Sequence, residues 1–387
     1  MVRSSLGILA FLVAALSALS SAFAARPDLI EVEAAGRTYR GKAVAHDASE
    51  FWLLERDGRL RRLPVKSVSR FRSLAPTFQG FGAADMRAAL RKELGREFDV
   101  VSSQHYVVAA PPGRARKIAD LCENVYRTFT TFFSVRGFHL DKPRFPLVAV
   151  VFKKREQFIQ YARRDGVALA SRILGYYHLE SNRVALYDDP KARISRQALA
   201  PGLASHSPQP GASARRLMGA RAGGLSTLEE TIIHEGTHQV AFNTGLHTRV
   251  GQNPRWVVEG LATLFEAPGI RQRSGDRGAR SRMSTFGFEG FRRYVAAGRK
   301  RRSLKEFIAG GSLFRKNLHH FYGEAWGLSF FLLETRSQKY SAYLKILARR
   351  DPLAPYTARE RVADFQKAFG NDLDRLEIDY LRFIGGL

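Results

Sequence analysis

The chain has 387 residues, a hydrophobic fraction of 45%, an aromatic fraction of 11% and a formal net charge of +26. This composition excludes a disordered or fibrous chain and indicates one large globular domain or two to three smaller ones. The only cysteine, Cys122, excludes an internal disulfide. Its place in the amphipathic run KIADLCENVYRTF indicates a buried structural thiol rather than a nucleophile.

The excess of basic residues is spread over many arginine pairs rather than gathered in one recognition helix. A surface of this kind attracts polyanions, and for an exported protein the candidates are anionic cell-envelope polymers, extracellular nucleic acid and acidic substrates. The arginine bias of a GC-rich genome is the simpler explanation of the charge. Because the basic residues form no recognisable motif with interleaved aromatic residues, no specific nucleic-acid partner is expected.

The first residues, 1–24, have the pattern of a signal peptide. Arg3 precedes the apolar run 6–16, and residues 22–24 read Ala-Phe-Ala, the small-x-small pattern of a signal-peptidase site. The apolar run is too short to span a membrane. We therefore expect an exported protein, periplasmic or secreted, without a transmembrane segment in its mature form.

A small all-β module is predicted for residues 25–75. Short alternating runs there are punctuated by Gly36, Gly41 and the turn pair Asp57-Gly58, which is typical of a small β-barrel. Residues 76–94 are predicted to form a linker followed by an amphipathic helix that begins near Ala83.

Residues 95–387 are predicted to form one larger α+β domain in three parts. The α/β part, 95–190, contains these predicted elements: a strand at His105, a helix from about Arg114 to Val135, an apolar strand from Pro146, a helix over 156–163, and a hairpin or edge strand over 175–188. Residues 191–225 are rich in Ser, Arg, Pro, Gly and Ala without a period, and we expect a mobile loop there. Helical patterns dominate residues 226–387, apart from a loose basic stretch over 272–282.

The run STLEETIIHEGTHQVAFN, from Ser226 to Asn243, contains candidate metal-binding residues. Ser226 and Glu229 form a predicted capping box, so a helix starts there. The helical period puts His234 and His238 on one face, one turn apart, so both imidazoles can reach one metal ion. Two histidines and a glutamate on a mostly apolar helix are costly to bury unless a metal pairs them.

A third ligand is needed, because catalytic zinc normally has three protein ligands and one open position. Glu259 lies in NPRWVVEGLATLFE, with Asn253 as the predicted helix cap and Pro254 at the first helical position. Asn243, Thr244 and Gly245 break the first helix, which lets the second fold back and bring Glu259 to the metal. The alternative ligand is Glu266, two turns further on.

The two motifs HEGTHQ and RWVVEGLATLFE resemble the HExxH and W-x-x-E-G-x-A elements of gluzincin peptidases, including aminopeptidase N relatives. More broadly, residues 95–385 are similar to a bacterial peptidase MA-like family of unknown function. The resemblance implies an α+β gluzincin-like metallopeptidase fold, with a sheet-bearing upper lobe over a helical lower lobe, and Zn²⁺ held by His234, His238 and Glu259. Thr263 stands where thermolysin-like enzymes have an acid, and the aminopeptidase motif Gly-x-Met-Glu-Asn is absent.

On this interpretation the chain hydrolyses peptide bonds in a peptide or protein substrate. Glu235 is the predicted general base that activates the zinc-bound water. Tyr322 is the predicted donor to the oxyanion, because related enzymes place a tyrosine after the ligand glutamate; packing at a helix start is the alternative.

Three further histidines rank below Tyr322. His319 and His320 are alternative donors to the transition state, although a neighbouring pair on a basic loop is more often solvated. His178 lines the cleft only if its segment is an edge strand that pairs with substrate.

A second hypothesis for the whole chain is an envelope-associated binding protein with a structural or vestigial metal site.

Overall fold

The computed structural model describes residues 28–168, 170–188, 212–216, 227–271 and 278–387. The chain divides into two compact units: residues up to Gly80, apart from the turn Asp57–Arg59, form the smaller, and residues from Phe81 onward form most of the larger. The predicted signal peptide, the capping residue Ser226 and most of the predicted loop 191–225 lie outside the described residues. Among the described residues, no helix combines the length and the apolarity needed to span a bilayer.

The smaller unit is an antiparallel sheet with strand order β4-β3-β2-β1-β5. Its strands are β1 (Leu29–Ala34), β2 (Arg37–His46), β3 (Glu50–Glu55), β4 (Leu60–Pro64) and β5 (Val68–Ala75). Alternate residues such as Ile30, Val32 and Leu53 are buried in a small core, as the period-two pattern requires. Gly36 has a φ of 73° in the turn between β1 and β2, a conformation that glycine adopts without strain. The module is all-β, as predicted.

The larger unit contains a mixed six-stranded sheet with order β11-β9-β10-β8-β7-β6. Its strands are β6 (Asp99–Ser102), β7 (Tyr106–Ala110), β8 (Leu147–Phe152), β9 (Ile173–His178), β10 (Arg183–Tyr187) and β11 (Ala212–Arg216). β8 runs parallel to β7 and β10, and the other neighbours are antiparallel.

Of the two predicted alternatives for residues 175–188, the structure shows the hairpin, β9–β10, and neither of its strands is at the edge of the sheet. The edge is β11, which lies inside the stretch predicted to be a loop and pairs with β9 from Ala212 to Arg216. The strand β11 forms through backbone pairing with β9, which the Ser- and Arg-rich composition of this stretch did not predict.

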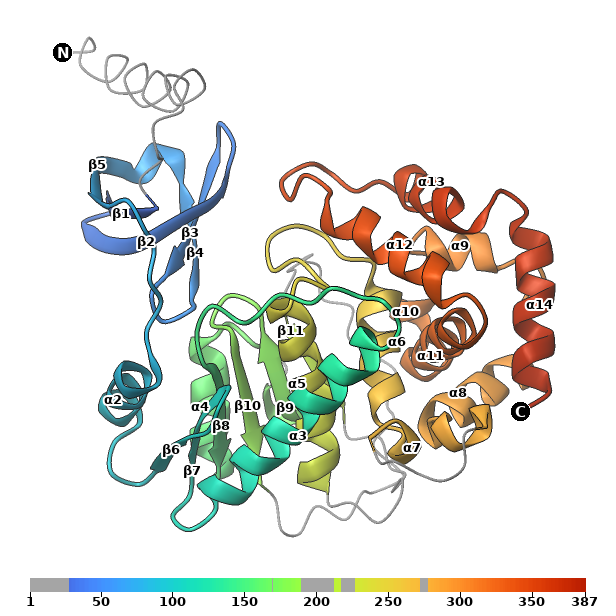
Figure 1. Ribbon diagram of the computed structural model, residues 1–387, viewed down its shortest axis with the longest axis horizontal. Coiled ribbons are helices and arrows are strands. Elements are labelled where there is room, and N and C mark those ends of the chain that lie inside the picture. The colour runs from blue at the N-terminus through green and yellow to red at the C-terminus, as the bar shows by residue number, and fades with distance from the viewer. Residues whose placement is uncertain (1–27, 169, 189–211, 217–226, 272–277) are drawn as a thin grey trace. The chain divides into compact units, whose positions relative to one another are not determined.

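Helices cover both faces of the six-stranded sheet (Figure 1). On one face, Met86 of α2 (Ala83–Leu94) and Phe158 of α4 (Arg155–Arg164) pack in a core with Val148 and Val150. The alternate strand residues face the other core, which contains α3 (Ala115–Ser134) and α5 (Thr227–Asn243). The helix α5 therefore lies against the sheet with one side and carries its histidines on another.

The remainder of the larger unit is helical, which confirms the predicted α+β class (Figure 1). Its α-helices are α6 (Arg255–Phe265), α7 (Pro268–Arg271), α8 (Thr285–Ala296), α9 (Leu304–Ile308), α10 (Leu313–Lys316), α11 (Leu318–Thr335), α12 (Ser337–Ala348), α13 (Ala358–Phe369) and α14 (Leu373–Gly385). A Cβ at Gly260 of α6 would lie 2.3 Å from the carbonyl oxygen of Ala325 on α11. Only glycine allows this close crossing, which fixes α6 beside α11.

Candidate metal centre

The helix α5 is buried and carries His234 and His238 on one side. Both side chains are about 1% exposed, and their ring centroids are 4.8 Å apart. The side-chain amide of Gln239 anchors the next turn to the sheet by donating to the backbone carbonyls of Val148 and Asn182, each at 2.9 Å. The histidines are thus presented by a helix whose rotation is fixed by the sheet beneath it.

The chain then turns back, and α6 supplies Glu259. The turn uses Gly245, whose φ of 77° favours glycine. Asn253, predicted to cap α6, does not do so: the cap position is Pro254, which makes no side-chain cap. The Asn253 side chain instead accepts from the N–H and donates to the carbonyl of Thr248. Asn253 therefore stabilises the turn before α6 rather than the N-terminus of α6 itself.

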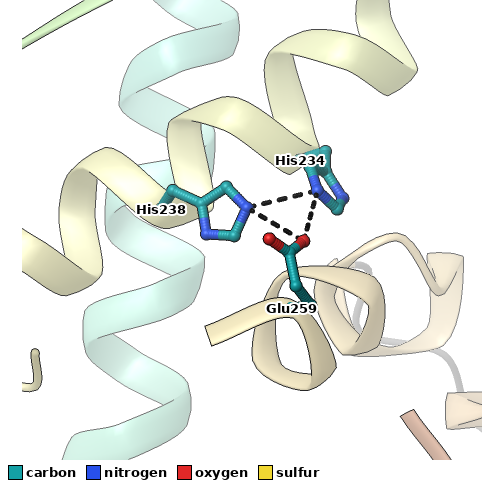
Figure 2. Close-up of side chains that lie close together, drawn as sticks. All are labelled: His234, His238 and Glu259. Atoms are coloured by element: carbon teal, nitrogen blue, oxygen red, sulfur yellow. Dashed lines mark hydrogen bonds and ion pairs between the residues drawn. The ribbon is translucent and has the colours of Figure 1, made fainter. Parts of the chain in front are cut away.

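Three donor atoms converge between the two helices (Figure 2). The Nε2 atoms of His234 and His238 are 3.2 Å apart, and Oε2 of Glu259 lies 3.5 Å from the first and 3.6 Å from the second. Ligand atoms about 2.0–2.1 Å from a tetrahedral zinc ion lie about 3.3 Å from one another. The buried group therefore has the donor set and spacing to hold a metal ion, and both histidines present the same ring nitrogen.

Glu266 reaches the same histidine from its opposite side. Its Oε1 lies 2.8 Å from Nδ1 of His234, and it is only 8% exposed. A histidine that ligates a metal through Nε2 commonly donates its Nδ1–H to a carboxylate, which fixes the tautomer and orients the ring. Glu266 thus stands outside the three-donor group. Thermolysin-like enzymes have an acid at the position of Thr263, and here Glu266 is the carboxylate that contacts the histidine instead.

We expect Glu266→Ala to weaken zinc binding by about 10–100-fold, because the imidazole of His234 loses its orienting acceptor. The dissociation constant is measured by competition with a chromophoric chelator. Glu266→Gln, which keeps an acceptor oxygen but no charge, should fall between the variant and the wild type. An unchanged affinity in Glu266→Ala would contradict this role.

The histidines and carboxylates of the centre shift one another's pKa values. Burial lowers the pKa of His234, but hydrogen bonds to Glu259 and Glu266 outweigh it and raise the pKa to about 9. Burial raises the pKa of Glu259, yet the neighbouring His238 and His234 hold it well below its usual range. Buried carboxylates need a cation nearby. A divalent metal ion supplies that charge without any proton on the histidines.

Glu235, the predicted general base, lies beside this group and is completely buried. Its Oε2 accepts the backbone N–H of Tyr177 on β9 at 2.8 Å. Burial raises the pKa of Glu235, while His234 and His238 oppose the shift. The sheet therefore holds the carboxylate in place, a contact that sequence reasoning missed because it joins residues 58 positions apart.

Tyr322 also lies at the centre. It is buried near the start of α11, and its ring centroid is 6.4 Å from that of His234, in an edge-on arrangement. Phe286 of α8 packs against Tyr322 and against His319, with centroids 6.3 and 6.1 Å away. His320 instead stacks on Tyr294, with centroids 4.9 Å apart.

His178 ends β9, and its Nδ1 accepts the N–H of Ser181 at 3.3 Å. That hydrogen bond ties His178 to the hairpin turn, and β9 is an inner strand.

One buried histidine was not singled out in the sequence. His247, nine residues after His238, is 3% exposed, packs edge-on against Phe242 and donates Nδ1–H to the carbonyl of Leu246 at 3.1 Å. Burial, together with the nearby charge of His238, lowers its pKa to about 3. His247 is therefore neutral in the folded chain. No pattern in the sequence distinguishes it from a solvated histidine.

Comparison with known proteins adds a family relation for the part of the chain that carries this site. A search of curated proteins found no match. A family model matches residues 229–354, which run from α5 beyond the end of α12 and include the three donor residues and Tyr322. The family is an uncharacterised one of the peptidase MA-like type, described as protein of unknown function (DUF1570).

Proposed function

We propose that this chain is an exported zinc-dependent peptidase with a gluzincin-like fold, which hydrolyses peptide bonds in peptide or protein substrates. The observation that carries the proposal is the convergence of Nε2 of His234, Nε2 of His238 and Oε2 of Glu259 at tetrahedral spacing, with the carboxylate of Glu235 in the next helical position. Three protein donors are the set typical of catalytic zinc, whereas structural zinc has four.

Zinc bound to these donors would polarise the scissile carbonyl and lower the pKa of the attacking water toward about 7. Glu235 accepts the proton of that water and passes it to the leaving amine nitrogen. The N–H of Tyr177 holds one carboxylate oxygen of Glu235 and so fixes the orientation of the carboxylate. The phenol of Tyr322, next to His234, donates to the oxygen on which negative charge develops. Glu266 keeps the ring of His234 in the ligating orientation.

The test measures metal content and hydrolysis together. Wild-type protein is expected to carry about one zinc per chain by mass spectrometry and to cleave a broad peptide library in a chelator-sensitive manner. Glu259→Ala should lose both the metal and the cleavage, because two histidines are left without their third ligand. Glu306→Ala, an exposed glutamate on α9, is the matched control and should lose neither.

Two outcomes contradict the proposal. A wild-type protein without zinc would remove the basis of the mechanism. Zinc without any cleavage would favour the alternative function, an envelope-associated binding protein in which the metal is structural or vestigial.

A further inference from the structure

Although basic residues are spread along the chain, one segment that packs near the metal centre carries a large share of the net charge. Residues 278–317 contain eleven lysines and arginines and two glutamates, a net charge of +9 out of +26 for the whole chain. About one tenth of the sequence thus carries one third of the charge excess. A single-sign surface of this density raises the local concentration of anionic ligands and speeds their association.

Some of these cations already have partners. Arg299 is buried with Glu324 and Glu377, and Arg282 pairs with Glu334. Arg293 and Arg302 make exposed ion pairs, with Glu289 and Asp374 respectively. These four residues are held by the fold or by weak surface contacts.

Seven exposed cations of this segment remain, and none makes an ion pair with a residue that the structure describes. Arg280 donates to the backbone carbonyl of Gly386, and Lys305 lies on α9. We call the other five the basic rim: Arg292, Lys300, Arg301, Arg315 and Lys316. An exposed cation without an internal partner keeps its full attraction for an external anion, because no neighbouring carboxylate competes for it. The rim therefore has the charge needed for an outside ligand.

The chain segments that carry the rim residues lie close to one aromatic contact, the stack of Tyr294 on His320. Arg292 stands two residues before Tyr294 on α8, and Arg315 and Lys316 form the end of α10, just before α11 begins. Lys300 and Arg301 follow Arg299, whose backbone N–H donates to the carbonyl of Tyr294 at 3.2 Å. The segments of α8, of α10 and of the loop after α8 that carry these cations thus lie close to the first turn of α11.

This first turn of α11 also belongs to the metal centre. His320 is two residues before Tyr322, whose ring packs against His234. His319 contacts Phe286, which in turn contacts Tyr322. The segments that carry the rim therefore lie next to the helix turn that contributes Tyr322 to the metal centre.

We propose that the basic rim docks acidic segments of polypeptide substrates, so that the metal centre prefers chains with a run of Asp or Glu near the scissile bond. This inference rests on the proposed function. An acidic polypeptide is favoured over single-stranded nucleic acid because recognition of bases uses a series of aromatic platforms, whereas the described segments that carry the rim contribute one tyrosine–histidine stack. Exposed charges select partners and speed their encounter, which is the role the rim plays here.

Binding can be measured separately from cleavage. The metal-loaded Glu235→Gln variant is titrated into a fluorescein-labelled decaglutamate peptide, and anisotropy is followed at low and physiological salt. In the same background, Lys300, Arg301, Arg315 and Lys316 are replaced together by glutamine. We expect about tenfold weaker binding in this rim variant at low salt, and a loss of most binding in the parent as salt rises.

The matched control replaces four other exposed cations of the larger unit, Arg96, Lys153, Arg163 and Arg164, by glutamine. It has the same net charge as the rim variant and should bind decaglutamate like the parent. Equal weakening in both variants, or no binding by the parent, would overturn the docking surface. Tighter rim-dependent binding of a ten-nucleotide single strand than of decaglutamate would overturn the choice of an acidic polypeptide.

The cleavage measurement uses the rim substitutions in a chain that retains Glu235. Here the value of kcat/KM for an acid-flanked peptide should fall about tenfold, while that for a neutral peptide of the same core stays unchanged. If wild-type protein cleaves no peptide, the proposed function fails, whereas the anisotropy experiment still decides whether the rim binds acidic chains. An equal loss for both peptides would overturn the substrate preference alone.

Discussion

Replacing Glu235 by glutamine is expected to leave zinc bound at about one ion per chain and to reduce peptide hydrolysis by about 10²–10⁴-fold. The amide keeps an oxygen that can accept the N–H of Tyr177, so the local fold is retained. The three donors of the metal group are untouched. Only the ability to take a proton is lost, which separates the proposed base from the proposed ligands. The measurement is metal content together with kcat/KM on a library-derived peptide.

The control for this prediction is Glu229→Gln, on the same helix. Glu229 is only partly buried and lies 3.7 Å from Lys117. A charge lost there should change neither metal content nor rate. Full activity in Glu235→Gln would refute the role of Glu235, and loss of zinc in that variant would show that its carboxylate is needed to hold the metal.

Replacing Arg299 by methionine is expected to lower the free energy of unfolding by about 3–5 kcal/mol, because it leaves buried carboxylates without their cation. Arg299 donates to both oxygens of Glu324, at 2.6 and 2.9 Å, and to Glu377 at 2.5 Å. The three side chains are 3%, 1% and 5% exposed. Urea denaturation of wild type and variant measures the change.

The pH dependence of this variant provides a second test. Without Arg299, burial and the neighbouring charge of Glu377 raise the pKa of Glu324 in the folded chain further above that in the unfolded chain. A raised folded-state pKa means that stability grows as the pH falls, so the destabilisation should shrink toward acidic pH. Arg302→Met, which removes a cation that is 79% exposed and pairs with Asp374, should cost no more than about 1 kcal/mol at any pH. Equal effects of the two substitutions would contradict the burial argument.

Local patterns were enough to predict most elements of the fold. The turn glycines and alternating residues gave the N-terminal β module, and the helical periods gave α2, α3 and α4 nearly to their ends. The pattern of β6 was not recognised, since four residues at the edge of a sheet carry little periodic signal. The strand β11 was missed because its composition is that of a loop, and it is ordered by pairing with β9.

The candidate site divides in the same way. The residue types and spacing of His234, Glu235 and His238 follow from the helical period alone. The partners of these residues come from elsewhere in the chain: Glu235 is held by Tyr177, and His234 is oriented by Glu266. Sequence reasoning had Glu266 only as an alternative ligand, because it cannot say which ring nitrogen a carboxylate will reach.

The sequence by itself determined which chemical groups are present and on which elements they lie, because helices and strands have fixed periods. Only the tertiary structure decided what those groups meet. It set three donor atoms 3.2–3.6 Å apart and buried Arg299 between two carboxylates. It also left the basic rim exposed beside the first turn of α11. The physical reason is that burial and pairing depend on how distant segments pack, and no local pattern records the partner of a side chain.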